Sequence, residues 1–512
     1  MEGKLRLILG DQLNINHSWF SKVAPNTTYV LCEQLSEATY TRHHLQKLVG
    51  FFAAMRSFAV ELERLGHQVI YFKINDPSNQ QDFSKNINQL ITAKSIQKFE
   101  YQLPDEYRLD EYFKKYCMTL KISYEAFDTE HFYTTRTDLL HYFKGKKNHT
   151  MEFFYRNMRK NYGILLNLDG SPYGGKWNFD SLNQKKWNTK SPIPSELKFS
   201  NNVAGILADI KQLKIETIGT IQNETIALPI TRSQALKQLE FFCTHLLMYF
   251  GDYQDAMHTE QPFLFHSKLS FALNLKLISP KEIVQHSLSH YKKNQDKIHI
   301  SQLEGFIRQI LGWREYMRGM YWKFMPDLKQ MNYFNHTHKL PEFYWTAKTK
   351  MNCLKCAVQT SLDFSYAHHI QRLMILGNFA LLSEVNPDEL DEWFLGIYMD
   401  AVQWVQLPNT RGMSQYADGG LIATKPYVSA ASYVNRMSDY CKGCHYDHNA
   451  KTGDKSCPFN SLYWNFLIQK RPLLNDNNRM KMMFSLLDKK SPNEVEFIQD
   501  RARDIIQHPD RY

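Results

Sequence analysis

The strongest constraint on the fold of this chain is a change of sequence pattern along its length. In the first part, short apolar and β-branched runs alternate with stretches of helical periodicity, and the runs lie at 5–9, 28–32, 68–74, 96–101 and 122–127. Strands that alternate with helices are typical of a parallel sheet wrapped by helices. Beyond about Thr231, long helical patterns continue to residue 512. The sequence therefore predicts an α/β domain over residues 1–135 and an all-α domain over residues 231–512.

The segment between them, residues 136–230, is predicted to be a basic interdomain connection. Residues 167–194 are rich in Gly, Pro, Asn and Ser, which is typical of a long surface loop. Residues 141–190 contain ten Lys or Arg against three acidic residues, and so carry most of the net charge of +10. Such a segment either attracts a polyanionic partner or is simply solvated.

Length and composition exclude several classes of protein. With 512 residues, of which 43% are apolar and 22% charged, the chain is globular rather than fibrous or a small disulfide-rich domain. Its apolar stretches, such as 239–250 and 373–382, are shorter than the roughly 18 residues of a membrane span. The first ten residues have too short an apolar core for a signal peptide. We expect a cytoplasmic protein with no membrane contact.

A polar loop, Gly-Asp-Gln-Leu at residues 10–13, follows the first predicted strand. Open α/β sheets bind ligands beyond the carboxyl ends of their strands, so Asp11 is a candidate ligand contact. A simple turn residue is the alternative. No Gly-x-Gly-x-x-Gly pattern accompanies the loop, which argues against a standard dinucleotide phosphate site.

The cysteines predict a metal site in the helical half. Cys441-Lys-Gly-Cys444 is followed after twelve residues by Cys457-Pro, a spacing typical of thiolate ligands on a tight turn and a returning loop. The fourth ligand is either Cys353 or Cys356. Zinc and an iron–sulfur cluster both accept four thiolates, so the spacing leaves the metal open, and it also allows none. The other thiols are expected to fill the core: Cys32, Cys117 and Cys243.

One charge falls on an apolar helix face. Residues 303–324 keep apolar side chains at helical spacing, and Arg314 lies inside this stripe. A buried cation needs a partner, because moving its charge out of water costs hydration free energy that only an ion pair or hydrogen bonds can offset. The partner is either a structural carboxylate or the phosphate or flavin ring of a bound cofactor.

Further segments of the helical half combine polar side chains with apolar helices. In order they are His266-Ser-Lys-Leu-Ser270, Trp313-Arg-Glu315, Ala367-His-His-Ile-Gln-Arg372, and the stretch from Trp393-Phe394 through Asp400 to Asn409. The first offers hydroxyls and a cation beside a predicted helix start, which suits a phosphate, although a plain helix cap has the same composition. The third places two His and one Arg on one apolar helix.

This order of motifs resembles the flavin-binding half of the photolyase and cryptochrome superfamily. With Cys353, Cys441, Cys444 and Cys457 added, the chain is similar to the bacterial iron–sulfur photolyases, including (6-4) photolyases, over almost its whole length. The resemblance implies the photolyase/cryptochrome fold, with a Rossmann-like α/β antenna domain and an all-α FAD-binding domain. It also implies that these four cysteines hold a [4Fe–4S] cluster and that Cys356 is a free thiol.

The resemblance also implies a flavin site. The residues that it assigns to FAD are Ser267, Leu269, Ser270, Arg314, Arg372, Asp400, Gln406 and Asn409. Of these, Arg372 and Asp400 match the ion pair at the flavin ring, and both lie in apolar helical contexts where each needs a partner. A salt bridge without flavin is the alternative. Gln406 stands where related sequences often have Glu.

Two histidines are the candidate catalytic residues. His369 matches the His that faces the lesion in (6-4) photolyases, where it would act as a general acid toward the hydroxyl of the 5′ base. His368 is the second candidate, and either ring could instead be a hydrogen-bonded core residue. Animal (6-4) enzymes carry another His one helical turn farther on, but Leu373 stands there, so their two-His mechanism is not implied.

The resemblance extends to electron transfer and to light collection. Trp345 and Trp393 match aromatic residues that relay electrons to the flavin, whereas Phe394 departs from the Tyr of related sequences. Asp11 and Glu37 match polar residues near the antenna chromophore, which is 6,7-dimethyl-8-ribityllumazine in this group.

The resulting hypothesis is light-driven repair of (6-4) pyrimidine–pyrimidone photoproducts by reduced FAD, in a monomer that binds UV-damaged DNA. A damaged base pair costs little to flip out of the helix, so no sequence-reading module is needed. Arg156, Arg159 and Lys160 are expected to contact DNA phosphates. Two alternatives stay open: a blue-light-sensing cryptochrome without repair activity, and an iron–sulfur primase-like nucleic-acid-binding protein.

Overall fold

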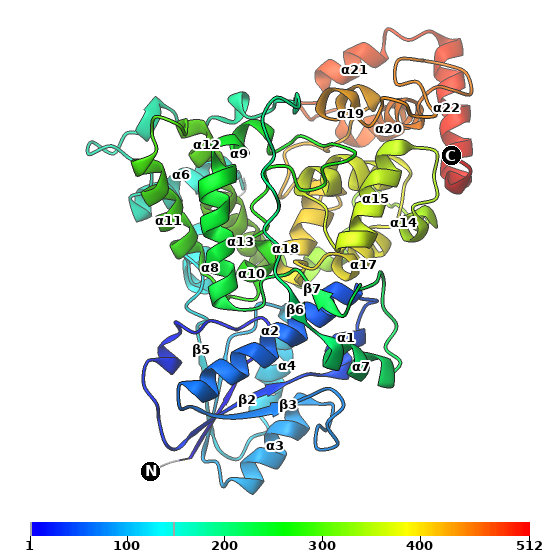
Figure 1. Cartoon of the computed structure of the whole chain (residues 1–512). Helices are drawn as coiled ribbons and strands as arrows, with labels where there is room; N and C mark the ends of the chain where they lie inside the picture. Colours follow the sequence, from blue (N-terminus) through cyan, green and yellow to red (C-terminus); the bar gives the residue numbers. More distant parts are fainter. Residues whose placement is uncertain (1–2, 147–148) are drawn as a thin grey trace.

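The computed structural model describes residues 3–146 and 149–512, and Lys147 of the basic segment lies outside them. An α/β domain lies below a larger helical domain (Figure 1). Its strands are β1 (Lys4–Leu7), β2 (Thr27–Cys32), β3 (Gln68–Phe72), β4 (Lys98–Gln102) and β5 (Ser123–Phe127). They form one sheet in the order β3-β2-β1-β4-β5, and every neighbouring pair is parallel. The predicted strands and their parallel arrangement are therefore confirmed.

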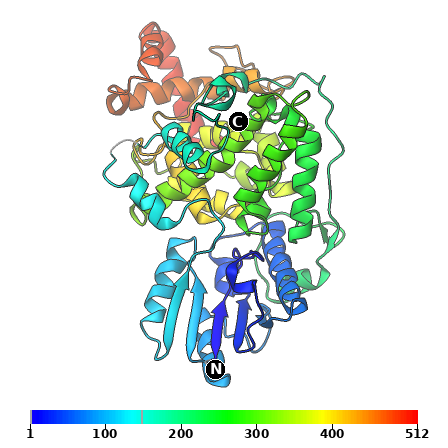
Figure 2. The same ribbon diagram turned by 90° about the vertical axis from the view of Figure 1, so that its left-hand side faces the viewer.

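Alternating side chains of the central strands build a core on each face of the sheet. In β2, Tyr29 and Leu31 belong to the core that contains α2 (Leu45–Arg64), whereas Val30 and Cys32 belong to the core with α3 (Phe83–Ala93) and α4 (Tyr107–Cys117). Successive strand residues point to opposite faces, so a strand that is apolar throughout needs helices on both sides. Figure 2 shows these helices flanking strands that run from the amino terminus toward the helical domain.

Helices fill the rest of the chain, as the sequence predicted. They are α8 (Arg232–Phe241), α9 (Leu247–Tyr253), α10 (Ser270–Asn274), α11 (Pro280–Lys293), α12 (Ile300–Ile307), α13 (Glu315–Phe324), α14 (Phe343–Thr346), α15 (Asn352–Phe364), α16 (Asn378–Leu382), α17 (Pro387–Ile397), α18 (Gln403–Leu407), α19 (Ala431–Met437), α20 (Pro458–Leu474), α21 (Lys481–Leu487) and α22 (Pro492–Gln507). Wider, π-helical turns occur at η4 (Phe242–Leu246), η5 (Arg308–Arg314), η7 (Gln371–Gly377) and η8 (Pro408–Ser414). Within the described residues, no helix combines the length and apolar character needed to cross a membrane.

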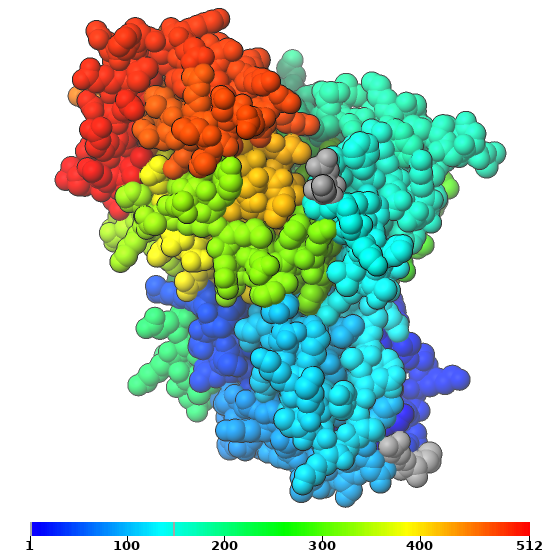
Figure 3. Space-filling view, turned by 180° about the vertical axis from the view of Figure 1, so that it is seen from behind, coloured from blue at the N-terminus to red at the C-terminus, as the bar shows by residue number. Residues whose placement is uncertain are grey.

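The connecting segment begins with helices that pack against the helical domain. α5 (Arg136–Phe143) contacts α13, and α6 (Met151–Tyr162) contacts η5. Figure 3 shows this part of the chain, in cyan, running from the α/β domain up along the helical domain. Gly319 of α13 makes the contact with α5 possible, because an added Cβ would collide with the ring of Phe143. The irregular part of the connection therefore starts after α6, which ends at Tyr162.

Farther along, the connection returns to the α/β domain. It forms α7 (Ala204–Gln212), flanked by the short antiparallel pair β6 (Asn201–Asn202) and β7 (Thr225–Ile226). Asp209 of α7 pairs with Arg56 of α2 at 2.7 Å. The connection thus ties the two domains together along its course.

A buried lysine joins the domains directly. Lys276, which follows α10, is 2% exposed, and its ammonium lies 2.9 Å from Asp105 and 3.3 Å from Asp11 of the α/β domain. Buried charges are stable only when they are paired, so the interface depends on this contact. The position of Asp11, beside β1, is therefore fixed from the helical domain.

Candidate functional site

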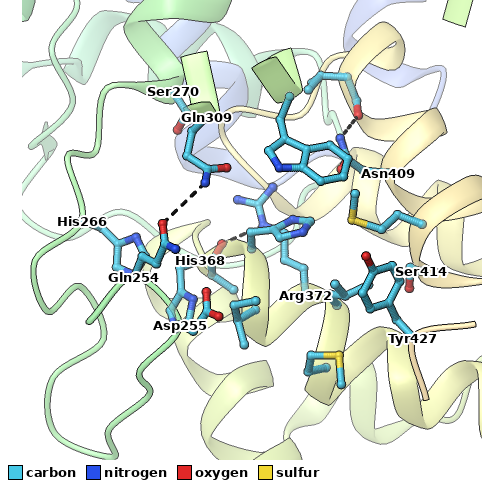
Figure 4. A pocket seen from close by; sticks show the side chains of 18 of the residues that line it. Gln254, Asp255, His266, Ser270, Gln309, His368, Arg372, Asn409, Ser414 and Tyr427 are labelled. Carbon is cyan, nitrogen blue, oxygen red and sulfur yellow. Dashed lines mark hydrogen bonds between the residues drawn. The ribbon is translucent and has the colours of Figure 1, made fainter. Parts of the chain in front are cut away.

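One cavity in the helical domain gathers the residues predicted to bind flavin or to act in catalysis. It has a volume of about 730 Å³ and is lined by η5, η7, η8 and the loop before α10. Figure 4 shows side chains around it, among them His266, His368 and Arg372. The predicted residues that line it are Ser267, Leu269, Ser270, Arg314, His368, His369, Arg372, Asp400, Gln406 and Asn409. The fold thus brings together segments that are far apart in the sequence.

Much of the cavity wall consists of π-helical turns, which the sequence analysis missed. η5 contributes Arg314, η7 contributes Arg372 and η8 contributes Asn409. η7 and η8 pack so closely at Gly377 that an added Cβ there would collide with the side chain of Ser414. A π-helical turn carries one extra residue and is frequent at functional sites. Apolar residues keep nearly helical spacing through such a turn, so periodicity gives no signal of it.

Arg372 and Asp400 form an ion pair at the cavity. The Nη2 of Arg372 lies 2.9 Å from Oδ1 of Asp400, and its Nε donates to the carbonyl of Ala367 at 2.7 Å. The guanidinium carbon lies 3.8 Å from the ring centroid of Tyr398. The backbone oxygen of Asp400 accepts a hydrogen bond from Asn274 at 2.6 Å. Both charges are therefore held in fixed positions beside the cavity.

Arg314 has no carboxylate within ion-pair distance among the described residues. Its guanidinium donates to the side chain of Asn274 and to the carbonyl of Leu273, and it lies 4.8 Å from the ring centroid of Trp404. Burial lowers the pKa of Arg314 to about 10, and its Nε makes no hydrogen bond. The sequence left two partners open for Arg314, a structural carboxylate or part of a bound cofactor. Among the described residues, the structural carboxylate is not found. A buried cation beside a cavity favours an anionic ligand.

Gln406 and Asn409 line the cavity, and each side chain is held by a hydrogen bond to a residue one helical turn away. The Nε2 of Gln406 donates to the hydroxyl of Thr410 at 2.5 Å, and the Nδ2 of Asn409 donates to the carbonyl of Val405 at 2.7 Å. Because each amide nitrogen already has a partner, the amide oxygen is the atom that can accept a hydrogen bond from a bound molecule.

The histidines of the cavity have pKa values below the ordinary value of 6.5. Burial lowers the pKa of His369 to about 4, with a further contribution from the charge of Arg372, and burial lowers the pKa of His266 to about 4. His368 is 4% exposed and stacks on His266, with ring centroids 4.5 Å apart. His369 instead exposes its ring to the cavity. Both candidate catalytic residues therefore line the cavity, His369 as an exposed residue and His368 as a buried one that stacks on His266.

Trp345, Trp393 and Phe394 form a short chain of aromatic rings. The ring centroids of Trp345 and Trp393 are 6.5 Å apart, and those of Trp393 and Phe394 are 5.5 Å apart. Trp345 is 38% exposed, Trp393 is 1% exposed, and Phe394 lines the cavity. The chain of rings therefore leads from the surface to the cavity, with a phenyl ring, which is hard to oxidise, at its inner end.

A second cavity is lined by cysteine side chains. Cys353, Cys441, Cys444 and Cys457 all face it, and we call it the cysteine cavity. Burial and the three neighbouring thiols raise the pKa of Cys353 above its usual range. Cys356 does not line this cavity, so Cys353 is the residue that joins the other three. In the described part of the chain, no group of three or more His, Cys, Asp or Glu has the arrangement of a single-ion site.

A third cavity, of about 140 Å³, lies between the domains. It is at the carboxyl ends of β1 and β4, where the strand order reverses, which is the usual ligand position of an open α/β sheet. Asp11 and Glu37 both line it, together with Glu106. Glu37 pairs with Arg108 at 2.6 Å. We call this the interdomain cavity.

The prediction that Arg159 contacts DNA is wrong. Its side chain is buried, and its guanidinium donates to the carbonyls of Ile164 at 3.2 Å and Trp177 at 2.7 Å. Arg156, one turn earlier on α6, is half-buried and pairs with Glu152 at 2.8 Å. Lys160 is exposed. Counting charges does not reveal which helix face each residue occupies, and α6 turns Arg159 inward.

Cations that the sequence analysis did not single out stand at the large cavity. Lys425 and Arg436 line it and are exposed. Lys186 of the connection is also exposed, and its ammonium lies 3.1 Å from the backbone oxygen of Asn435, next to Arg436. Lys425 and Arg436 have no charged neighbours in sequence, so no run of charge marks them.

Comparison with known proteins gives a consistent result. The model of the deoxyribodipyrimidine photo-lyase-related protein family matches residues 6–225. A (6-4) photolyase of Agrobacterium fabrum is 39% identical over 488 residues, which cover 94% of this chain and 95% of that protein. An uncharacterised protein of Acanthamoeba polyphaga mimivirus is 31% identical over 112 residues, which are 22% of this chain and 84% of that protein.

The fold is also similar to a solved structure. A bacterial class III photolyase from Agrobacterium tumefaciens superposes with a TM-score of 0.59 at 13% sequence identity. The match covers 100% of this chain and 98% of that one. At this identity the likeness concerns the fold alone, and it includes both domains.

Proposed function

Since the chain belongs to the deoxyribodipyrimidine photo-lyase-related family, we propose that it is a (6-4) photolyase, which uses light to reverse (6-4) pyrimidine–pyrimidone photoproducts in DNA. The observation that carries the proposal is the single cavity that collects the candidate flavin-binding residues and His369. We further propose that it acts as a monomer in the cytoplasm.

The large cavity suits FAD in size and in chemistry. Its volume of about 730 Å³ lies within the range of about 300 to 1,000 Å³ that is usual for cofactor sites. Arg372 offers donors and Asp400 offers acceptors to the flavin ring, while Ser267 and Ser270 offer hydroxyls. Arg314, with a free Nε, would contact an anionic part of the cofactor. When bound, reduced FAD supplies the electron that light transfers to the lesion.

The chain itself supplies the proton. His369 exposes its ring to the cavity, and it must be protonated before it can act as a general acid. Its pKa of about 4 keeps it neutral, and the negative charges of bound DNA would raise that pKa. We therefore assign His369 to the protonation of the 5′ base, and His368 to the wall that holds the site in place.

Two further groups fit the smaller cavities. The four thiols of the cysteine cavity suit a [4Fe–4S] cluster, whose last ligand Cys457 is followed by Pro458, as is common for such sites. Asp11, Glu37 and Glu106 line the interdomain cavity, and each is already paired with a lysine or an arginine of the chain. Such a lining offers hydrogen-bond acceptors with little net charge, which suits an uncharged polyol on a heterocycle, the chemistry of 6,7-dimethyl-8-ribityllumazine.

DNA binding is proposed to centre on the mouth of the large cavity. Lys425 and Arg436 stand beside the place where a flipped lesion would enter, and Lys186 extends the positive surface. Arg156 and Lys160 on α6 would contact phosphates farther from the lesion. Because phosphate contacts release counterions, binding should weaken as salt increases.

The test begins with purification in the absence of oxygen. Released flavin, iron and sulfide are quantified, and a duplex with one (6-4) lesion is then illuminated with the reduced protein, beside a dark control and His369→Ala. Repair in the light that the variant lacks supports the proposal. Flavin without repair would indicate the cryptochrome alternative, and metal without flavin would indicate the primase-like one.

A further inference from the structure

The large cavity and the cysteine cavity are joined by two side chains. Tyr440 lines the cysteine cavity, directly precedes Cys441, and is 1% exposed. Its hydroxyl accepts a hydrogen bond from Nε2 of Gln371 at 3.0 Å. Oε1 of Gln371 in turn accepts the backbone N–H of His368 at 3.1 Å. A pair of hydrogen bonds therefore leads from the cysteine cavity to the backbone of a residue in the wall of the large cavity.

The amide of Gln371 fits this link in one orientation. The backbone N–H of His368 is a donor, so Gln371 must present its oxygen there and its nitrogen to Tyr440. If the amide were rotated, the NH2 group of Gln371 would face the backbone N–H of His368, and two donors would oppose each other. Because Gln371 is 1% exposed, a lost partner leaves a buried polar atom without a hydrogen bond. The N–H of His368 therefore sets the orientation of the Gln371 amide, and the Tyr440 hydroxyl holds the other end of that amide in place.

Tyr440 is fixed by the segments that bear the cysteines. Its backbone oxygen accepts a hydrogen bond from Nδ2 of Asn352 at 2.9 Å, and Asn352 precedes Cys353 at the start of α15. Cys441 follows Tyr440 directly. A group that binds Cys353 and Cys441 together would hold Tyr440 between them.

At the other end of the link, Gln371 is the first residue of η7, and Arg372 follows it. The backbone N–H of Arg372 donates to the oxygen of His368 at 3.2 Å, so the two residues share one turn. Arg372 projects from this turn toward Asp400. The hydrogen bond from His368 to Gln371 thus helps to set the direction of the Arg372 side chain.

We infer that Gln371 and Tyr440 are positioning residues that make retention of the flavin depend on the group in the cysteine cavity. The inference rests on the proposed function, because it takes FAD and the cluster as the two occupants. With the cysteines bound to the cluster, Tyr440 is held, and Gln371 keeps the turn of His368 and Arg372 in place. When the cluster is lost, Gln371 loses a fixed partner, and Arg372 holds the flavin less firmly.

Tyr446 provides a matched control. Its ring lines the same cysteine cavity, but its hydroxyl lies 3.4 Å from the backbone oxygen of Tyr512 instead of contacting Gln371. Removing either hydroxyl changes the cysteine cavity by one oxygen atom. Only one of the two changes interrupts the link to the large cavity.

The experiment compares Tyr440→Phe, Gln371→Met and Tyr446→Phe in the full-length holoprotein. Iron and sulfide content, the rate of FAD dissociation in the dark and the midpoint potential of the bound flavin are measured. Tyr440→Phe and Gln371→Met should each accelerate FAD dissociation by about tenfold at wild-type iron content. Both should lower the potential, since a displaced Arg372 stabilises reduced flavin less. Their double variant should be no faster than either alone, and Tyr446→Phe should match the wild type.

Removal of the cluster with a chelator completes the test. It should accelerate FAD dissociation in the wild type but add nothing in Tyr440→Phe. The inference is overturned if Tyr440→Phe, with its iron intact, keeps the wild-type rate and potential, or if Tyr446→Phe changes them equally. A wild-type protein that contains no flavin or no iron would instead refute the proposed function, so the two failures are distinct.

Discussion

The imidazole of His266 stacks on that of His368, with ring centroids 4.5 Å apart and planes inclined by 19°. The stack joins the segment with Ser267 and Ser270 to the segment with His369 and so closes one wall of the large cavity. Burial lowers the pKa of both stacked rings, which keeps two adjacent imidazoles from carrying like charges. The wall behind His369 is therefore held in the neutral form.

Replacement of His369 by Gln should lower the single-turnover rate of (6-4) repair by about 10²-fold or more, the usual contribution of a general acid. The FAD content should not change. The pKa of His369 lies near 4 before DNA binds, and the charge of bound DNA should raise it. Only the protonated ring can donate the proton, so the wild-type rate should fall as the pH rises above the pKa of His369 in the complex. Repair per light flash across a pH series measures both effects. A variant with the wild-type rate and pH profile would contradict the assignment.

Asp400→Asn should weaken FAD retention, because the amide cannot balance the charge of Arg372. Leaving a largely buried cation without its partner costs about 3 kcal/mol. Flavin content after gel filtration measures the effect. Asp363→Asn, on an exposed carboxylate that contacts Gln359, is the matched control and should keep its flavin. Equal flavin content in the two variants would speak against a role of the ion pair.

Trp345→Phe should slow photoreduction of the flavin, because it removes the exposed end of the chain of rings. Phe394→Tyr should accelerate it, because a ring that is easier to oxidise then stands beside the cavity. Bleaching of the oxidised flavin band under blue light with an external reductant measures both rates. If both variants bleach at the wild-type rate, the electrons take another route.

Lys425→Ala and Arg436→Ala should each weaken DNA binding and reduce the slope of log K against log salt by about one. Fluorescence anisotropy with a lesion-bearing duplex at several salt concentrations measures the slope. Arg159→Ala should leave the slope unchanged and lower the stability of the fold, since its buried guanidinium donates to the backbone carbonyls of Ile164, Leu165 and Trp177. A reduced slope for Arg159→Ala would contradict its burial.

The stability of the protein should fall between pH 7 and pH 5, in part through His44. This buried residue caps α2, with Nδ1 accepting the N–H of Gln46 and Nε2 2.8 Å from the carbonyl of Leu362. Burial lowers its pKa from 6.5 to about 4, so in that interval the unfolded state binds a proton that the folded state does not. The free energy of unfolding should fall by about 2 kcal/mol on account of His44 alone. Urea unfolding at both pH values should show a smaller difference for His44→Gln.

The sheet could be predicted because short runs of apolar and β-branched residues lie between polar turns, most clearly at β2, whose residues are all buried. Val30 and Tyr29 point to opposite faces, yet both are apolar, and this is the pattern of a strand covered on both sides. The cavity residues could be placed together only through a resemblance, since Arg372 and Asp400 come from different segments. Nothing local in either segment indicates that the two side chains meet.

Other parts of the site depend on geometry that a pattern does not contain. The π-helical turn at Arg314 differs from an α-helical one by a single residue, which the apolar spacing absorbs. The burial of Arg159 follows from the rotation of α6 against η5, and its charge alone predicts the opposite. Lys425 reaches the cavity from a loop and Arg436 reaches it from α19, and the sequence shows each of them as a single cation.

The ten residues from Ser267 to Lys276 meet three separate parts of the molecule. Ser267 lines the large cavity, Asn274 binds both Arg314 and the backbone of Asp400, and Lys276 reaches into the other domain. One inserted or deleted residue would pull at least one of these side chains off its partner. This stretch therefore cannot change in length, whereas exposed loop positions between α6 and α7, such as residues 167–170 and 188–190, can take up insertions.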